Sequence, residues 1–539
     1  MSLHPRPWRA KRPLLRVDVI RSLRPRRMAP IVLLLLLSSA PQALAQLTIG
    51  GGTLARTETN VVTNELSRHL PAAGVRKYSR YVGFLRWETT HTLSIFAETR
   101  QGISSRTWKS DTRRWSDWYH HGNPLGAPIQ RISGSGDSPG IDTGIAILPG
   151  WSPTFSDWSV YQGVARPSTN PMFEVDFQSG LHQLDPVSRT TTIGQSRPGF
   201  ATASGGQVPF DFRHFDPQAS LSMASPVGAA RSLRHVYGTA VPRGHVRSSR
   251  FNAANVPLVE LRREHDTAPQ WIDHGRPPGV DGVAVGPGSA TSILHDYLNA
   301  PNAVDREEQR YVFVATNPVE DGYGEGLNGD EVFYRRGNSQ GETWNALGSA
   351  GGLVYGAPLA IPYYTGVPIA GGLGRIVVFA TVRDGNGRYV LKSRFHDGHG
   401  WDAQWAHWGA PTGLGGDKFK LTSAVVWWNG TPNQMANLRI NAFGYSEENG
   451  SRAGQLVEFH WDGGAWRFAT PRTAPDGQSF RTSHAAVIDE GTRDRIVVVG
   501  RTSTGRIYEF AREIESGQIV SERWTDLSSE PITILRAGF

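Results

Sequence analysis

The sequence predicts an all-β protein, a β-propeller with seven blades. Its 61 Gly, 35 Pro and 17 Trp, without sustained helical periodicity, are typical of turn-rich β structure. A unit of strand, hairpin, strand and tryptophan-bearing edge recurs about every 60–75 residues. Seven such units in series close into a ring, which leaves only short strand edges exposed.

The clearest unit spans residues 375–411. Residues 375–380 are β-branched or aromatic and predict a buried strand. Residues 384–387, Asp-Gly-Asn-Gly, predict a hairpin turn, because Gly and Asn accept positive φ. Residues 388–395 alternate and predict the return strand, and the unit closes on Trp-Ala-His-Trp-Gly-Ala-Pro at 405–411.

The same order of elements recurs on both sides of this unit. The other units are expected at 93–124, 158–177, 233–277, 310–344, 438–466 and 495–531, with 245–251 as a middle strand of the third. The final run 532–535 is expected to complete a blade begun by the N-terminal segment. A ring of six or eight blades stays open because the second unit is poor. A tandem of β-sandwiches is the alternative, but sandwich strands usually recur every 8–12 residues without a long matched unit.

The N-terminus predicts export. Basic residues at 21–27 precede an apolar run at 31–37 and the small-x-small sequence Ala-Leu-Ala at 43–45. The apolar run is shorter than the about 20 residues that span a bilayer. We therefore expect a signal peptide at 1–45, an irregular segment at 46–75 and the propeller at 76–539, in a periplasmic or extracellular protein without stable membrane insertion. Met28 is an alternative start.

The net charge of +8 belongs to the leader. Residues 1–45 hold nine Lys or Arg and one acid, so 47 basic and 47 acidic residues remain after cleavage. A nearly neutral chain lacks the bulk positive field that nucleic acid requires, so no nucleic-acid partner is expected. The chain has no cysteine, which excludes disulfides and thiolate metal sites.

No residues can be assigned to metal binding or catalysis. The turn at 384–387 lacks the further acidic ligands of a calcium loop. The His-Asp-Gly-His sequence at 396–399 lacks a third or fourth zinc ligand. A glycoside hydrolase needs two carboxylates roughly 5–10 Å apart, which sequence cannot pair. We expect no metal and no cofactor.

Three unit ends share the pattern Trp-x-x-ring-Gly-x-Pro. The first tryptophan is expected to fill the core between blades. The ring before glycine is expected at a partly wet blade end, where rings stack on sugar C–H faces and polar groups bind hydroxyls. The candidate ligand-binding residues are Trp118, His121, Trp271, His274, Trp405 and Trp408.

This pattern, together with Ile/Val-Phe-Ala at 95–97 and 378–380, resembles the bacterial seven-bladed propeller lectins that bind fucose and related sugars between blades. The resemblance implies several shallow pockets at blade junctions. It favours a protein that binds carbohydrate or a cell-surface glycan, of unknown oligomeric state.

Residues 332–344 resemble the Asp-box hairpin of sialidase-type propellers, with Ser339 in place of the aspartate. The resemblance implies that Trp344 packs into its blade and is buried. Two further functions therefore stay open: a glycoside hydrolase of sialidase-like propeller type, and a protein-interaction scaffold.

Overall fold

The computed structural model describes the chain in segments that fall into two compact units. One unit is residues 57–536, and the other joins residues 1–56 to residues 537–539. The predicted signal peptide lies outside the described residues. Those residues are 48–49, 52–53, 55–60, 71–83, 86–99, 102–122, 145–149, 156–163, 172–179, 210–211, 218–224, 231–239, 241–242, 258–264, 270–280, 290–295, 307–315, 329–338, 341–365, 373–397, 400–430, 435–447, 454–490, 493–528 and 532–537.

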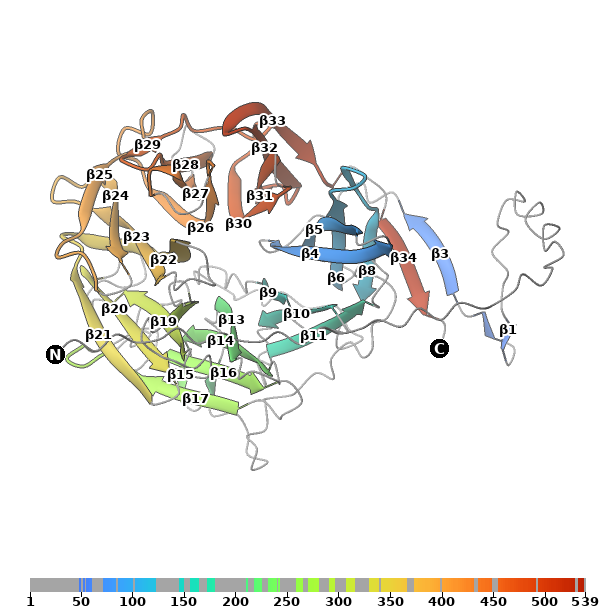
Figure 1. The fold of residues 1–539 in the computed structure, drawn as a ribbon, viewed down its shortest axis with the longest axis horizontal. Coiled ribbons are helices and arrows are strands. Elements are labelled where there is room, and N and C mark those ends of the chain that lie inside the picture. The colour runs from blue at the N-terminus through green and yellow to red at the C-terminus, as the bar shows by residue number, and fades with distance from the viewer. Residues whose placement is uncertain are drawn as a thin grey trace, which may run out of the picture. The chain divides into compact units, whose positions relative to one another are not determined.

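Five antiparallel sheets of four strands follow one another in the described part of the chain (Figure 1). The first two are β13 (Gln218–Ala224), β14 (Arg231–Thr239), β16 (Leu258–Glu264) and β17 (Gln270–Gly275), then β18 (Ala290–His295), β19 (Glu307–Ala315), β20 (Glu331–Asn338) and β21 (Gly341–Ser349). The third is β22 (Leu353–Thr365), β23 (Leu373–Arg383), β24 (Tyr389–His396) and β25 (Ala406–Gly409). The last two are β26 (Phe419–Trp428), β27 (Leu438–Ser446), β28 (Leu456–Trp461) and β29 (Trp466–Phe468), then β30 (Phe480–Asp489), β31 (Arg493–Thr502), β32 (Ile507–Glu515) and β33 (Gln518–Asp526).

Two further sheets begin earlier in the chain than these five, and neither has four strands. One contains β4 (Ala72–Gly83), β5 (Arg86–Thr99), β6 (Gly102–Lys109), β8 (Trp118–Gly122), the short β7 (Arg114–Trp115) and two further strands, β34 (Ile532–Ala537) and β3 (Ala55–Asn60). The other contains β9 (Ile145–Pro149), β10 (Ser156–Gly163) and β11 (Met172–Ser179).

The seven sheets contact one another in chain order through their first strands. β4 contacts β9, β9 contacts β13, and the series continues through β18, β22, β26 and β30, which contacts β4 again. Sheets that meet in cyclic order form a β-propeller. We number them blades 1 to 7 in this order, and the predicted fold class is confirmed.

The hydrophobic core is divided among the blade junctions. Phe379 of blade 5 packs in one cluster with Phe459 of blade 6, and Phe443 of blade 6 packs in another with Phe510 of blade 7. All four side chains are buried. Full burial of such a side chain stabilises by roughly 1.5–3 kcal/mol, so each blade depends on its neighbours for stability.

The outer strands of four blades carry a β-bulge at the same place. In β25, Gly409 pairs with Leu391 and His407 with Lys392, which leaves Trp408 without a partner. The corresponding unpaired residues in β8, β17 and β21 are His121, His274 and Leu347. The motif Trp-x-x-ring-Gly is therefore the sequence of a bulge, in which two residues of one strand oppose one of the other.

The glycine after the bulge adopts a left-handed backbone conformation. Gly275, Gly348 and Gly409 have φ of +66°, +84° and +88°. A side chain at such φ is strained, which explains the glycine in each unit end. The equivalence of His121, His274 and Trp408 is thus a property of the backbone, and Leu347 shares it without an aromatic ring.

The C-terminal run adds a strand to blade 1. Ile532 pairs with Trp118 and Ile534 with His120, so β34 runs parallel to β8. This agrees with the expectation that residues 532–535 complete a blade at the N-terminal side of the propeller.

Two strand and packing expectations differ from the structure. In blade 3, β14 pairs with β16, so residues 258–264 form the third strand, and residues 245–251 lie outside the described part of the chain. Trp344 is half-buried and not buried, because it lies in an outer strand beneath the guanidinium of Arg335, 5.4 Å from the ring centre. Ser339 lies outside the described residues.

Candidate functional site at the blade junctions

Tryptophans of the outer strands join neighbouring blades through a backbone carbonyl. The Nε1 of Trp344 in blade 4 donates to the carbonyl of His274 in blade 3 over 3.0 Å. The Nε1 of Trp118 in blade 1 donates to the carbonyl of Leu527 in blade 7 over 2.6 Å. His274 is the bulged residue of its strand. Leu527 follows β33 in the sequence Trp-x-x-Leu-Ser, which matches the same position.

An arginine on the third strand reaches the same carbonyl. Arg335 pairs across the strands with Trp344. Arg394 and Arg106 each lie next to the last residue of their strand that pairs with the outer strand. The guanidiniums of Arg106, Arg335 and Arg394 donate to the carbonyls of Leu527, His274 and Leu347. We call this arrangement of tryptophan, arginine and bulge carbonyl the inter-blade latch. Because its acceptor is backbone, the side chain before glycine is free to vary.

Of the candidate ligand-binding residues, Trp118 and His274 are buried. Trp118 is 3% exposed and belongs to the core between blades 7 and 1. The Nε2 of His274 lies 2.7 Å from the carboxylate of Glu260, which also pairs with Arg262. The expectation of a partly wet ring before glycine is therefore not met at His274, because the bulge turns this side chain toward Tyr237 and Glu260.

The pair in blade 5 is half-buried. Trp408 donates from Nε1 to Ser393 Oγ over 2.8 Å and contacts the rings of Trp461 and Trp466 of blade 6. The Nε1 of Trp405 is buried without a hydrogen-bond partner in the described part of the chain. At this junction the ring before glycine is partly exposed, as expected.

The six candidates do not form one site. They lie on β8, on β17, and on β25 or directly before it, which belong to blades 1, 3 and 5. Each pair occupies its own blade, and the side chains of His121 and Trp271 lie outside what the structure describes. Any ligand contact by these residues would therefore be a set of separate pockets.

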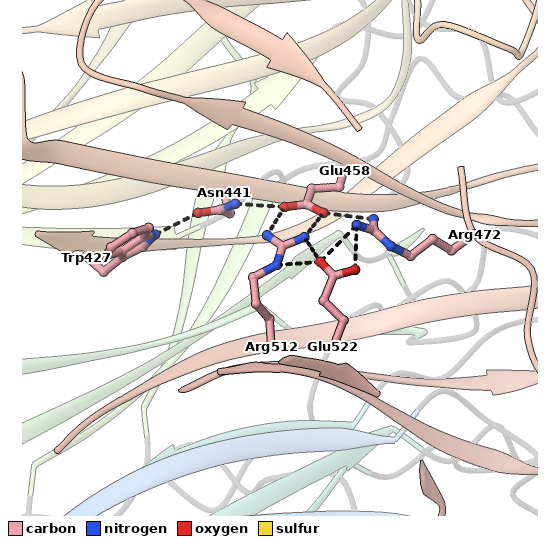
Figure 2. A network of polar contacts seen from close by, with 6 residues as sticks. All are labelled: Trp427, Asn441, Glu458, Arg472, Arg512 and Glu522. Atoms are coloured by element: carbon pink, nitrogen blue, oxygen red, sulfur yellow. Dashed lines mark hydrogen bonds and ion pairs between the residues drawn. The ribbon is translucent and has the colours of Figure 1, made fainter. Parts of the chain in front are cut away.

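The junction of blades 6 and 7 holds a buried network of charged groups (Figure 2). Arg512 donates from both Nη atoms to Glu458, which also accepts from Arg472 over 3.0 Å and from Asn441 over 2.8 Å. Arg512 and Arg472 both contact Glu522 as well. The network joins β27 and β28 of one blade to β32 and β33 of the next.

The arginines keep Glu458 ionised. Burial alone would raise the pKa of this carboxyl group, but the hydrogen bonds and charge of Arg512, with the charge of Arg472, lower it below its ordinary value of 4.5. A second buried carboxylate, Glu509, pairs with Arg495 within blade 7 and accepts from the Nε1 of Trp115 in blade 1. Both acids are bound by arginine, which gives them a structural role.

A pocket of about 160 Å³ opens at this same junction. Blade 6 contributes Ser446 and Gly454, from the end of β27 and the approach to β28. Blade 7 contributes Ser479, Arg481, Arg501, Thr502 and Ser503, from the start of β30 and the end of β31. It is smaller than the roughly 300–1,000 Å³ of pockets for drug-sized ligands, so it can receive one end group of a ligand.

Backbone contacts hold the two sides of the pocket together. Gly454 N donates to Ser479 Oγ and Phe480 N donates to Gly454 O, both over 2.9 Å. A Cβ at Gly454 would lie 2.8 Å from Ser446 O of the same blade, so the close approach of this segment to the end of β27 requires glycine here. The pocket wall is therefore fixed before any ligand enters.

Comparison with known proteins finds likeness of fold at low sequence identity. No family model and no curated protein sequence matches the chain. The SapL1 lectin in complex with α-methyl fucoside is similar at 16% identity and TM-score 0.34, over 71% of this chain and 95% of that one. An ulvan lyase of polysaccharide lyase family PL25 is similar at 11% identity and a TM-score of 0.42, over 87% of this chain and 98% of that one. The α-L-arabinanase of Penicillium chrysogenum is similar at 12% identity and a TM-score of 0.32, over 72% of this chain and 98% of that one.

In the described part of the chain, no helix has the length and apolarity that crossing a membrane requires. Among the same residues, no group of three or more His, Asp or Glu side chains is placed to hold a metal ion.

Proposed function

We propose that this protein binds carbohydrate at its blade junctions, and that the pocket between blades 6 and 7 is a principal binding site. The observation that carries the proposal is the lining of that pocket. Three serines, one threonine and two arginines supply the hydrogen-bonding groups that sugar hydroxyls require, on a rigid backbone frame.

Trp408 is the candidate from the sequence that best fits a second contact. Its half-exposed ring lies at the junction of blades 5 and 6, beside Trp461. Sugars stack on such rings, whereas the buried Trp118 and His274 offer no comparable face. Each pocket alone is small and binds weakly, so useful affinity would come from several contacts with one multivalent glycan surface.

A glycan-array screen of the mature chain tests the proposal. The protein should bind a chemically related set of glycans more strongly than a control propeller of unrelated function does. Retention of none would contradict the proposal and favour the scaffold alternative. Export is part of the same proposal, since a glycan-binding protein of this kind meets its ligand outside the cytoplasm. Mass spectrometry of the secreted protein should find a mature N-terminus near Gln46.

A further inference from the structure

The pocket between blades 6 and 7 presents hydrogen-bond donors. Among the described residues that line it, two are arginines and none carries a carboxylate. Guanidinium groups donate only, and they match carboxylate and sulfate oxygens in a fixed fork geometry. The lining therefore favours a negatively charged group over a neutral one.

The two arginines stand side by side. Arg481 on β30 pairs with Arg501 on β31, so their side chains project from the same face of the blade. Like charges directly opposite each other destabilise a sheet. The ring of Tyr445 in blade 6 lies 5.7 Å from the guanidinium carbon of Arg481 and holds it toward the junction. An anion placed between the two arginines would be attracted to both.

Two serine hydroxyls complete the donor set. Ser446 Oγ accepts from Gln455 N and Ser479 Oγ accepts from Gly454 N, both over 2.9 Å. Neither hydroxyl donates a hydrogen bond within the described part of the chain. Both residues are at most 8% exposed, and each hydroxyl still has its one hydrogen to donate to a ligand.

We propose that this pocket binds the anionic group of an acidic glycan, either the carboxylate of a uronic acid or a sulfate ester. The inference rests on the proposed carbohydrate-binding function and specifies its ligand class. Arg481 and Arg501 bind the charged oxygens, and Ser446 and Ser479 donate to the same group or to a neighbouring hydroxyl. A neutral sugar in this place could accept hydrogen bonds from the same groups but would gain no attraction between charges.

The test compares arginine variants that keep polarity and lose charge. The pocket variants are Arg481→Gln, Arg501→Gln and the double variant. Arg523→Gln is the matched control, because Arg523 is an exposed arginine on β33 of the same blade and does not line the pocket. Circular dichroism and a thermal melt establish that each variant is folded.

Three oligosaccharide probes of equal length separate the sources of charge. They are an oligogalacturonate, the same oligosaccharide after reduction of its carboxyl groups, and a sulfated neutral oligosaccharide. At least one charged probe should bind the wild type at least about tenfold more tightly than the reduced probe. The double variant should lose at least about tenfold of that binding, and Arg523→Gln should lose less than about twofold.

Inorganic sulfate supplies a readout that does not depend on any glycan. At fixed ionic strength, millimolar sulfate should raise the Tm of the wild type and of Arg523→Gln more than that of the double variant. Equal binding of charged and reduced probes, unchanged in the double variant, would overturn the anionic ligand and leave carbohydrate binding in place. Sulfate protection without binding of any probe would support the anion site and contradict the carbohydrate function. Absence of both effects would overturn both.

Discussion

At the scale of single residues, the inter-blade latch explains why one position carries unrelated side chains. His274, Leu347 and Leu527 each offer a backbone carbonyl to the next blade. At His274 and Leu527 a tryptophan Nε1 donates to this carbonyl. At Leu347 only Arg394 donates in the described part of the chain, and the Nε1 of Trp405 has no partner there. Repetition of a ring before glycine in the sequence suggested ligand contact, but that resemblance among units reflects the bulge.

Replacement of Trp118 by Phe should separate the two roles of the tryptophan. Phe keeps most of the apolar ring and loses the Nε1 donor to Leu527, which leaves a buried carbonyl less satisfied. We expect a loss of about 1–3 kcal/mol in the free energy of unfolding by urea. Trp344→Phe should cost less, because Trp344 is half-buried whereas Trp118 is buried. Equal losses in the two variants would contradict the latch.

At the scale of elements, the bulge and its glycine set the shape of each outer strand. The strand pattern of blade 5 was predictable, since the alternation and the Asp-Gly-Asn-Gly turn at residues 384–387 led to β23 and β24. Two kinds of feature were not predictable. The third strand of blade 3 was missed because a long insertion separates it from β14. The pocket was missed because the packing of blade 6 against blade 7 brings Ser446 and Arg501, 55 positions apart, to one junction.

Gly409→Ala tests the bulge directly. A Cβ at Gly409 would meet nothing within 4 Å, so the cost of the change is conformational and follows from φ of +88°. We expect a loss of about 1–2 kcal/mol in denaturant unfolding. Gly385→Ala is the control, because a Cβ at Gly385 also meets nothing and its φ is not positive. A loss at Gly385 as large as at Gly409 would show that strain is not the cause.

At the scale of the whole molecule, the blades are held together by what crosses their junctions. Apolar clusters, latches and ion-pair networks each join one blade to the next, and β34 adds the C-terminal run to blade 1. The repeat of units and the choice of an all-β closed fold were predictable from composition and spacing. The charged networks were not, because the partners of Glu458 come from β27, β32 and the loop after β29.

Glu458→Gln should weaken the junction of blades 6 and 7 at neutral pH. Removal of the carboxylate leaves Arg512 buried with a weaker partner, and breaking such a pair typically costs about 3–5 kcal/mol. Urea unfolding at pH 7 measures the loss. Asp462→Asn is the control, because its pair with Arg467 is largely exposed and contributes little.

The same network makes the stability of the wild type depend on pH in the acid range. The pKa of Glu458 is lower in the folded protein than its ordinary value of 4.5, so its stabilisation is present above that value and is lost as pH falls through the folded pKa. The stability of the wild type should therefore fall more steeply than that of Glu458→Gln between about pH 5 and about pH 3. Parallel curves would show that Glu458 does not contribute through its charge.

Equilibrium binding of a retained glycan to two variants, measured side by side, tests directly whether the pocket between blades 6 and 7 is the main binding site. The first is the pocket variant Arg481→Gln with Arg501→Gln, and the second is Trp408→Leu, which places at the bulge the residue that Leu347 already provides in blade 4. If the main site is the pocket between blades 6 and 7, the pocket variant should lose at least about tenfold in affinity and Trp408→Leu at most about threefold. The opposite ranking, with binding kept by the pocket variant and lost in Trp408→Leu, would contradict it.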